Sequence, residues 1–495
     1  MKKTIRLIAL FLALMISFGV VSSYLSLAAN ESNVTAEITK YYCTKDGVKL
    51  IWNKVPGTDK YYVYRWYSGI SDWEEIKVTT KRGYTDKDVT GGTKYYYAVA
   101  TADGETLKYG RQKSIVFLAS PDMKTAKMTS KGIYIKWNKS AGAKSYNIYR
   151  KTESTSYKKL GSVKAKTTKY TDTTVKNCKN YTYAVRAVSG DSKSTYSSVT
   201  KSGAYIKTPT LVSVKNSPSG VKVSWNKSTA PDSYEILRKT DSGKWKKAGT
   251  ASASASDFTD KKAPFGKKCT YKVRAVFGEN KSYCSNKLAL HALDPKKPAI
   301  ALTWDDGPYS PVTNQILDCL EKYDSRATFF VVGSRVETYK DCVKRQASLD
   351  CETGCHTFNH ASLTRLSGEE IKTEVNSAVR AIEKYSGGNK VRLVRTPGGA
   401  VNDTVRANVG YPMINWSIDT LDWQHRTTSK TVSTIKSQAR DGAIVLMHDL
   451  YVATGNAAVE IIPWLVNQGY QLVTVSELFD LKGITPQAGQ LYTHG

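Results

Sequence analysis

Two stretches of the 495-residue sequence hold residues whose types and spacing could bind a metal and use it. Asp305 and Asp306 follow the apolar run 300–304, and a Gly-Pro pair comes next. Further on, His356 and His360 are four residues apart, which on a helical turn places both imidazoles on one face. Two histidines and one carboxylate leave an open position for water, as catalytic rather than structural zinc sites do. The alternative is a pair of surface histidines beside an ordinary strand-end Asp, because HxxxH alone is a weak motif.

Such residues recur at the ends of apolar runs throughout the C-terminal part. From Pro295 onward, short apolar runs alternate with amphipathic segments of helical length, which predicts a parallel sheet that is open or closed into a barrel. Active-site residues of such folds collect at the carboxyl ends of the strands. The predicted strands are 300–304, 327–332, 391–394, 413–418, 444–447 and 471–475, and the predicted helices lie near 312–322, 336–347, 368–385, 432–440 and 456–467. Five successive strand ends deliver Asp305-Asp306, the His356/His360 pair, Arg395, the segment Asp419–Trp423, and His448-Asp449.

Five motifs in this order resemble those of the polysaccharide deacetylases of carbohydrate esterase family 4. They are TWDDGP (303–308), HTFNH (356–360), RTPGG (395–399), DTLDW (419–423) and LMH (446–448). The resemblance covers residues 297–482 and implies a distorted (β/α) barrel. Two longer stretches, HTFNHASLTRLS and DGAIVLMHD, are most similar to bacterial peptidoglycan N-acetylglucosamine deacetylases. Three positions depart from the family pattern: Trp304 replaces Phe, Gly398 replaces Tyr, and Cys355 replaces Asn.

The resemblance implies a metal centre with a base beside it. Asp306, His356 and His360 would bind the ion, which is expected to be Zn²⁺, with Co²⁺, Mn²⁺ or Ni²⁺ as alternatives. A zinc ion in such a site can lower the pKa of a water ligand to about 7. Asp305 would be the general base, and Arg395 would pair with it and orient it.

The remaining motif residues would act on the departing group and on the acetyl methyl. His448 would be the general acid that protonates the sugar amine, and Asp422 would favour its imidazolium form. The backbone N–H of Gly398 would join the metal in stabilising the oxyanion. Trp423 and Leu446 would wall a small apolar pocket for the methyl group.

The N-terminal part of the sequence repeats itself at intervals of 85 to 88 residues. Tryptophans end three stretches of one type, GVKLIW, GIYIKW and GVKVSW, at Trp52, Trp137 and Trp225, and the tripeptide Tyr/Phe-Thr-Asp starts at Tyr84, Tyr170 and Phe258. Such a period means three copies of one domain. Short alternating strands separated by turn residues predict a small antiparallel sandwich in each copy. The copies resemble fibronectin type III modules, with an immunoglobulin-like relative as the alternative.

The excess of positive charge lies wholly in the part of the chain before residue 297. Residues 297–495 contain 20 Lys+Arg and 21 Asp+Glu, whereas the 296 residues before them contain 53 and 22. The lysines are scattered singly along the sequence, which argues against nucleic-acid binding. Binding to anionic wall polymers and a merely soluble Lys-rich surface are both compatible with this pattern. The tyrosines are expected in sandwich cores and strand pairs rather than in sugar-stacking platforms.

The first 29 residues have the layout of a secretory signal peptide. Basic residues precede the apolar run 7–21, and small residues near 28–29 suit cleavage; an uncleaved anchor is the alternative. No later segment is long and apolar enough to span a bilayer. Eight cysteines in so long a chain are not a disulfide scaffold. Cys269 could nevertheless pair with Cys284, and Cys351 with Cys355.

The sequence therefore predicts a multidomain, exported, metal-dependent hydrolase that removes N-acetyl groups from N-acetylglucosamine units of a cell-wall polysaccharide, with peptidoglycan as the expected substrate. The alternatives are a chitooligosaccharide deacetylase, an acetylxylan esterase, or a non-catalytic surface protein that binds glycans. The expected boundaries are 1–29 for the signal peptide, 33–119, 120–206 and 207–293 for the repeats, 297–482 for the deacetylase domain and 483–495 for a C-terminal tail.

Overall fold

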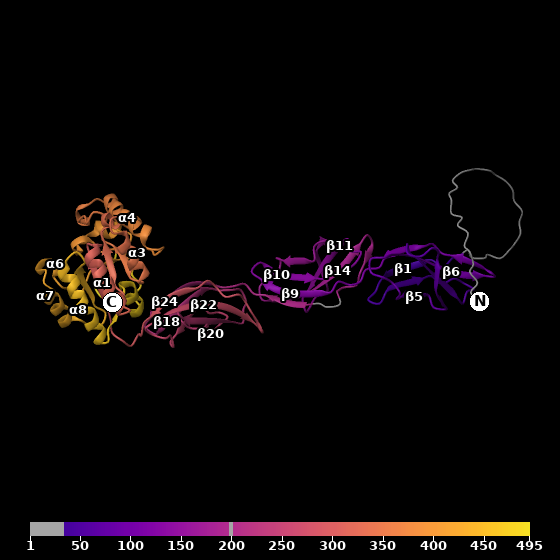
Figure 1. The fold of residues 1–495 in the computed structure, drawn as a ribbon, viewed down its shortest axis with the longest axis horizontal. Coiled ribbons are helices and arrows are strands. Elements are labelled where there is room, and N and C mark those ends of the chain that lie inside the picture. The colour runs from indigo at the N-terminus through magenta and orange to yellow at the C-terminus, as the bar shows by residue number, and fades with distance from the viewer. Residues whose placement is uncertain (1–33, 198–200) are drawn as a thin grey trace.

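The computed structural model describes residues 34–197 and 201–495, so the expected signal peptide lies outside the described residues. The molecule is elongated (Figure 1): three β-sheet units follow one another along its longest axis, and an α/β part lies at the end opposite the first unit. We call the sheet units unit 1 (β1–β8), unit 2 (β9–β16) and unit 3 (β17–β24). In the two described ranges, none of the helices has the length and apolarity that crossing a membrane requires.

Each unit combines an antiparallel three-stranded sheet with a five-stranded one. The three-stranded sheets are β1 (Ile38–Cys43), β2 (Val48–Trp52) and β5 (Gly83–Asp86); β9 (Met123–Thr129), β10 (Gly132–Trp137) and β13 (Lys169–Asp172); and β17 (Thr210–Ser217), β18 (Gly220–Asn226) and β21 (Asp257–Asp260). The five-stranded sheets are β3 (Tyr61–Trp66), β4 (Glu74–Thr79), β6 (Lys94–Asp103), β7 (Thr106–Tyr109) and β8 (Lys113–Val116); β11 (Ser145–Lys151), β12 (Lys158–Lys164), β14 (Lys179–Ser189), β15 (Ser192–Lys193) and β16 (Lys201–Tyr205); and β19 (Ser233–Thr240), β20 (Lys246–Ser252), β22 (Lys267–Phe277), β23 (Asn280–Lys281) and β24 (Leu288–Ala292).

The repeated sequence motifs occupy equivalent places in the three units. The motif tryptophans, Trp52, Trp137 and Trp225, are buried in the cores. The Asp of each Tyr/Phe-Thr-Asp motif is also buried, and it accepts hydrogen bonds from an Arg and a Tyr of the five-stranded sheet. The sets are Arg65–Asp86–Tyr97, Arg150–Asp172–Tyr183 and Arg238–Asp260–Tyr271, with Tyr-to-Asp distances of 2.7, 2.8 and 2.9 Å. A buried carboxylate is costly unless it is paired, so the motif recurs with its partners.

Parallel strands form a closed ring in the α/β part. The central strand β25 (Ala299–Asp305) is buried along its whole length and pairs with β26 (Thr328–Val331) and β30 (Ile444–His448). From β26 the pairing continues through β27 (Glu352–Cys355) and single bridges at Val394 to β28 (Met413–Ile414). The same chain segment then enters β29 (Ile418–Asp419), which pairs with β30 and closes the ring. Two short strands, β31 (Gln471–Leu472) and β32 (Leu491–Tyr492), join β25 and β28.

Helices follow most of these strands, as the alternation in the sequence predicts. They are α1 (Ser310–Lys322), α2 (Gly333–Val336), α3 (Lys340–Ser348), α4 (Gly368–Tyr385), α5 (Asp403–Asn408), α6 (Asp422–His425), α7 (Thr428–Gln438), α8 (Val452–Asn467) and α9 (Val475–Lys482), with 3₁₀ turns η1 (Leu363–Arg365) and η2 (Pro397–Gly399). The bounds of α4 match the prediction, and a capping box between Ser367 and Glu370 fixes its start. The helix predicted at 336–347 is interrupted after Val336, where the exposed Glu337 and Thr338 offer no apolar side chain to anchor another turn.

Three further expectations need correction. The apolar run 391–394 forms only two isolated bridges, from Val394 to Cys355 and to Met413, rather than a strand. The expected C-terminal tail returns to the barrel as β32. All eight cysteines are free thiols. Cys351 and Cys355 are four residues apart along an extended segment, so about 13 Å separates them, which is too far for a disulfide. Cys269 faces Thr240 and Leu290 across the sheet rather than Cys284.

Candidate active site

The predicted base and the predicted acid end two neighbouring parallel strands. In the register of β25 and β30, Asp305 lies opposite His448. Asp306 comes directly after the end of β25 and has a positive φ of 70°, so the chain turns sharply there. The strand-end rule therefore brings these three residues to one edge of the barrel.

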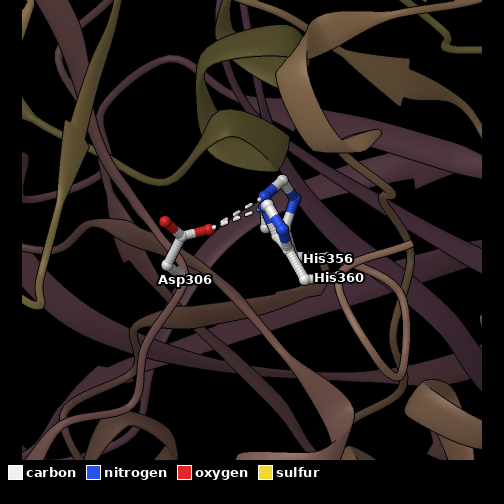
Figure 2. Close-up of side chains that lie close together, drawn as sticks. All are labelled: Asp306, His356 and His360. Carbon is white, nitrogen blue, oxygen red and sulfur yellow. Dashed lines mark ion pairs between the residues drawn. The ribbon is translucent and has the colours of Figure 1, made fainter. Parts of the chain in front are cut away.

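Asp306, His356 and His360 form a cluster of three side chains that could hold a metal ion. Their ligand atoms all lie within 4.8 Å of one another. The Asp306 carboxylate faces both imidazole rings (Figure 2), with Oδ1 3.3 Å from Nε2 of His356 and 3.1 Å from Nε2 of His360. This Oδ1 is buried and has no aligned hydrogen-bond donor. Nδ1 of His356 donates to the carbonyl oxygen of Arg395 at 2.8 Å, which leaves Nε2 as an acceptor. A buried carboxylate oxygen that accepts no aligned hydrogen bond and an imidazole nitrogen with a lone pair are the ligand atoms that a divalent cation needs.

The two histidines do not lie on a helix, so that premise of the sequence analysis is wrong. They follow β27 in a loop in which Thr357 (φ 61°) and His360 (φ 57°) adopt left-handed conformations. Glu374 of α4 accepts hydrogen bonds at 2.9 Å from the backbone N–H groups of both Phe358 and Asn359. This carboxylate holds the loop, and the loop conformation rather than the helical period directs both rings to Asp306.

Arg395 is fully buried and binds Asp305 directly. Its Nη1 donates to Oδ1 of Asp305 and to the hydroxyl of Thr303, both at 2.7 Å. Two further donors reach the carbonyl oxygens of Ile414 (2.9 Å) and Asn415 (3.1 Å). Asp305 is 3% exposed, and its other oxygen, Oδ2, lies 3.8 Å from Nε2 of His356. The guanidinium thus fixes one carboxylate oxygen and leaves the second beside the cluster.

His448 is held in a charged pair with Asp422. Asp422 is buried, and its carboxylate accepts from the backbone N–H and from Nδ1 of His448, both at 2.8 Å, and from the hydroxyl of Thr454 at 2.7 Å. Burial opposes the imidazolium, but the bond to Asp422 and the negative charges of Asp305 and Asp306 outweigh it and raise the pKa of His448 to about 9. The ring therefore carries a proton at neutral pH.

The three residues predicted to contact the oxyanion and the acetyl group lie in different surroundings. Gly398 has a positive φ of 64° within η2, a conformation that side chains rarely adopt. Trp423 is 46% exposed on the short helix α6, whereas Leu446 is buried in β30. Trp423 is thus the one of the three with a large surface open to a ligand.

Sequence analysis assigned no role to two acidic residues near this edge. Asp449 is fully buried beneath Gly307, where a Cβ on that glycine would clash with its carboxylate. Burial, reinforced by Asp306 and opposed by a hydrogen bond from Thr313, raises the pKa of Asp449 to about 7. Glu374, which holds the histidine loop, is the second. Asp449 was expected at a strand end, directly after the LMH motif, but without a role, whereas nothing in the sequence marks Glu374.

The C-terminal part of the chain is similar to known proteins. Residues 292–413 match the family model described as "Polysaccharide deacetylase". The "Peptidoglycan-N-acetylmuramic acid deacetylase PdaC" of Bacillus subtilis is 45% identical over 190 residues, which are 38% of this chain and 40% of that protein. The "Peptidoglycan-N-acetylglucosamine deacetylase" of Bacillus cereus is 36% identical over 195 residues, which are 37% of this chain and 89% of the relative. The solved structure of Bacillus subtilis PdaC is 44% identical, covers 38% of this chain and 93% of its own, and has a TM-score of 0.37.

Proposed function

The chain belongs to the polysaccharide deacetylase family, and on this premise we propose that it is an exported, metal-dependent enzyme that removes N-acetyl groups from N-acetylglucosamine units of peptidoglycan. One observation carries the proposal. A cluster suited to a divalent cation, Asp306 with His356 and His360, lies beside a buried carboxylate and at the same barrel edge as a charged imidazole. The relatives named peptidoglycan deacetylases support the choice of substrate.

The residues of the chain divide the hydrolysis of an amide between them. Asp305 takes the proton of the attacking water through Oδ2, because Arg395 occupies Oδ1. His448 gives its proton to the departing amine, and Asp422 keeps the ring charged and oriented until then. Gly398 offers a backbone N–H to the developing oxyanion. Trp423 and Leu446 border the acetyl methyl.

Asp306, His356 and His360 would hold the metal. When bound, it supplies a Lewis acid for the amide carbonyl and for the hydrolytic water. Zn²⁺ suits one carboxylate and two imidazoles, and Co²⁺, Mn²⁺ or Ni²⁺ could take its place.

The rest of the chain brings the enzyme to its substrate. We propose cleavage of a signal peptide at 1–29, fibronectin III-like modules at 33–119, 120–206 and 207–293, and a deacetylase domain that begins near 297. The sheet order and the repeated buried Arg–Asp–Tyr sets support three copies of one module. The modules would hold or space the enzyme at the cell surface.

Acetate release tests the proposal. The purified protein is incubated with peptidoglycan, chitin oligomers and acetylated xylan side by side, with and without a chelator. We expect release from peptidoglycan that the chelator abolishes and Zn²⁺ or Co²⁺ restores. Activity that survives complete removal of the metal would contradict the metal assignment, and release from xylan or chitin alone would contradict the substrate.

A second candidate is deacetylation of the N-acetylmuramic acid units of the same polymer. The Bacillus subtilis relative, at 45% identity, is named for that sugar. Mass analysis of the muropeptides after digestion shows which of the two sugars has lost its acetyl group, so the same experiment decides between the candidates.

The His448–Asp422 pair predicts the alkaline side of the pH profile. Because the pKa of His448 is raised to about 9, kcat is expected to fall as pH rises through that value and the acid loses its proton. Asp422→Asn should move this fall down by more than one pH unit, toward the ordinary histidine value of about 6.5. The contribution of this pair to the free energy of unfolding depends on pH in the same direction. It is complete below about pH 6.5 and is lost as pH rises toward 9.

The control is Asp419→Asn, since Asp419 is a strand-end aspartate on β29 whose carboxylate accepts, among the residues the structure describes, only the local N–H of Leu421. Its pH profile should match that of the wild type. An unchanged alkaline limb in Asp422→Asn would show that His448 does not titrate as the acid.

A further inference from the structure

One aromatic side chain stands immediately before the edge strand of the five-stranded sheet in each β-unit. Trp73 precedes β4, Tyr157 precedes β12 and Trp245 precedes β20, and all three are partly exposed. The strand that follows begins with two glutamates in unit 1 but with two lysines in units 2 and 3. The position is therefore shared, while its charge differs between unit 1 and the other two.

In unit 3 three lysines gather around this aromatic ring. The ammonium groups of Lys272, Lys239 and Lys287 lie 4.0, 5.9 and 6.0 Å from the centre of the Trp245 ring. They come from β22, from β19 and from the residue before β24, which are neighbouring strands. We call these four residues the Trp245 cluster. Within residues 34–197 and 201–495, none of its three ammonium groups has a carboxylate at ion-pair distance.

Three other cations on the same sheet share one counter-ion. Lys247, Arg274 and Lys281 all lie within 4 Å of the single carboxylate of Glu235. Among the described residues, the Trp245 cluster by contrast holds three converging positive charges that share no carboxylate. Like charges brought together in this way repel one another, and a bound anion would relieve that repulsion.

Unit 2 has a counterpart built from different residues. Tyr157 packs on Tyr196 with ring centres 4.7 Å apart, and Tyr196 also contacts Tyr149 at 5.1 Å. Lys151 lies over Tyr157 and Arg186 over Tyr196, each at 5.2 Å. Tyr196 remains 38% exposed. Units 2 and 3 therefore both present aromatic carbon and cations at equivalent places, although their sequences differ there.

We propose that the Trp245 cluster and its counterpart in unit 2 bind a phosphodiester-linked sugar or polyol polymer of the cell wall. The ammonium and guanidinium groups pair with its phosphates, and the aromatic rings contact the C–H faces of its sugar or polyol units. The excess of positive charge lies in the repeated part, whereas the catalytic part that takes the acetylated glycan is nearly neutral. The basic surface therefore fits a second, more densely charged polymer rather than the substrate itself.

The arrangement of the units suits a long ligand. Units 2 and 3 follow one another along the molecule (Figure 1), and a polymer with one charge in each repeating unit can engage both sites at once. This inference deepens the proposed surface attachment and rests on the enzyme's acting at the wall.

Co-sedimentation with isolated walls tests it. The full-length protein is mixed with intact walls and with the same walls stripped of phosphodiester polymers by hydrofluoric acid, at low and high salt. We expect binding to intact walls to be at least about tenfold tighter and to weaken with salt, as contacts between exposed charges do. Equal binding to stripped walls would identify peptidoglycan as the ligand and overturn the proposal.

Two variants with the same change in charge make the test specific to the cluster. The cluster variant replaces three lysines by glutamine: Lys239, Lys272 and Lys287. The control replaces three exposed lysines on or beside the three-stranded sheet of unit 3: Lys222, Lys227 and Lys261. Only the cluster variant should lose affinity, by about tenfold for three exposed ion pairs. Equal losses of affinity in both variants would show that net charge alone determines wall binding, and would contradict a specific site at the Trp245 cluster.

The Trp245→Ala variant tests the contribution of the aromatic ring separately from that of the lysine charges. We expect it to weaken wall binding while the salt dependence of binding remains. Acetate release from a soluble glycan should be unchanged in all three variants. A failure of wall binding with normal acetate release would overturn only this inference, whereas a loss of acetate release with normal wall binding would overturn only the proposed function.

Discussion

Asp305→Asn is expected to lower kcat for acetate release by about 10²- to 10⁴-fold, the range that a positioned general base contributes. The substitution keeps the shape of the side chain and an oxygen that can accept from Nη1 of Arg395, which lies 2.7 Å from Oδ1 of Asp305 in the wild type. It removes the basic oxygen that lies beside the histidine cluster. Because Asp305 would not itself hold the metal, the variant should contain as much metal as the wild type.

Asp306→Asn is the contrasting variant. Oδ1 of Asp306 lies within 3.3 Å of Nε2 of both imidazoles. Replacing this carboxylate by a neutral amide should therefore remove metal and activity together. Metal content by elemental analysis and kcat are measured for both proteins. A normal kcat in Asp305→Asn would remove this residue from the role of base, and a metal-free Asp305→Asn would place it among the ligands instead.

The positions of the reacting groups could be predicted because they depend on a simple periodic pattern. Apolar runs end at Asp305 and at His448, and parallel pairing of adjacent runs brings their ends together; the register of β25 and β30 places these two residues opposite each other. The five ordered motifs then suggest the role that we propose for each residue. Strand-end chemistry is therefore visible in the sequence whenever the strands are buried and parallel.

The conformation of the histidine loop could not be predicted in this way. Helical spacing suggested how His356 and His360 converge, but two left-handed residues and the carboxylate of Glu374, on a later helix, direct them instead. Glu374 follows His360 by 14 residues and has no motif of its own. Contacts of this kind depend on how α4 packs against the barrel, which local propensity does not encode.

The basic surface of the β-units shows a similar limit. The lysines are scattered singly along the sequence, which argued against nucleic-acid binding. Lys239, Lys272 and Lys287 nevertheless meet around Trp245, because β19, β22 and β24 are neighbours in the sheet. Sequence spacing reveals a charged patch on one helix or strand, but it does not reveal a patch assembled across strands.

Arg395→Met is expected to lower the free energy of unfolding of the α/β part by about 3–5 kcal/mol, the cost of breaking a buried ion pair. Arg395 is completely buried, and its loss leaves the Asp305 carboxylate, 3% exposed, without its cationic partner. The carbonyl oxygens of Ile414 and Asn415 also lose the guanidinium as a donor. Methionine fills most of the space, so the loss of charge and of hydrogen bonds dominates. Urea unfolding of the full chain measures the effect.

Two further variants identify the cause. Arg345→Met removes an arginine whose ion pairs with Asp318 and Glu321 lie at the surface, and it should cost less than about 1 kcal/mol. Adding Asp305→Asn to Arg395→Met neutralises the stranded carboxylate and should recover part of the lost stability, which gives a coupling energy of opposite sign to the single losses. If the double variant is instead as unstable as the sum of the two singles, the buried charge is not what Arg395 offsets, and its role is limited to packing and to the two carbonyl groups.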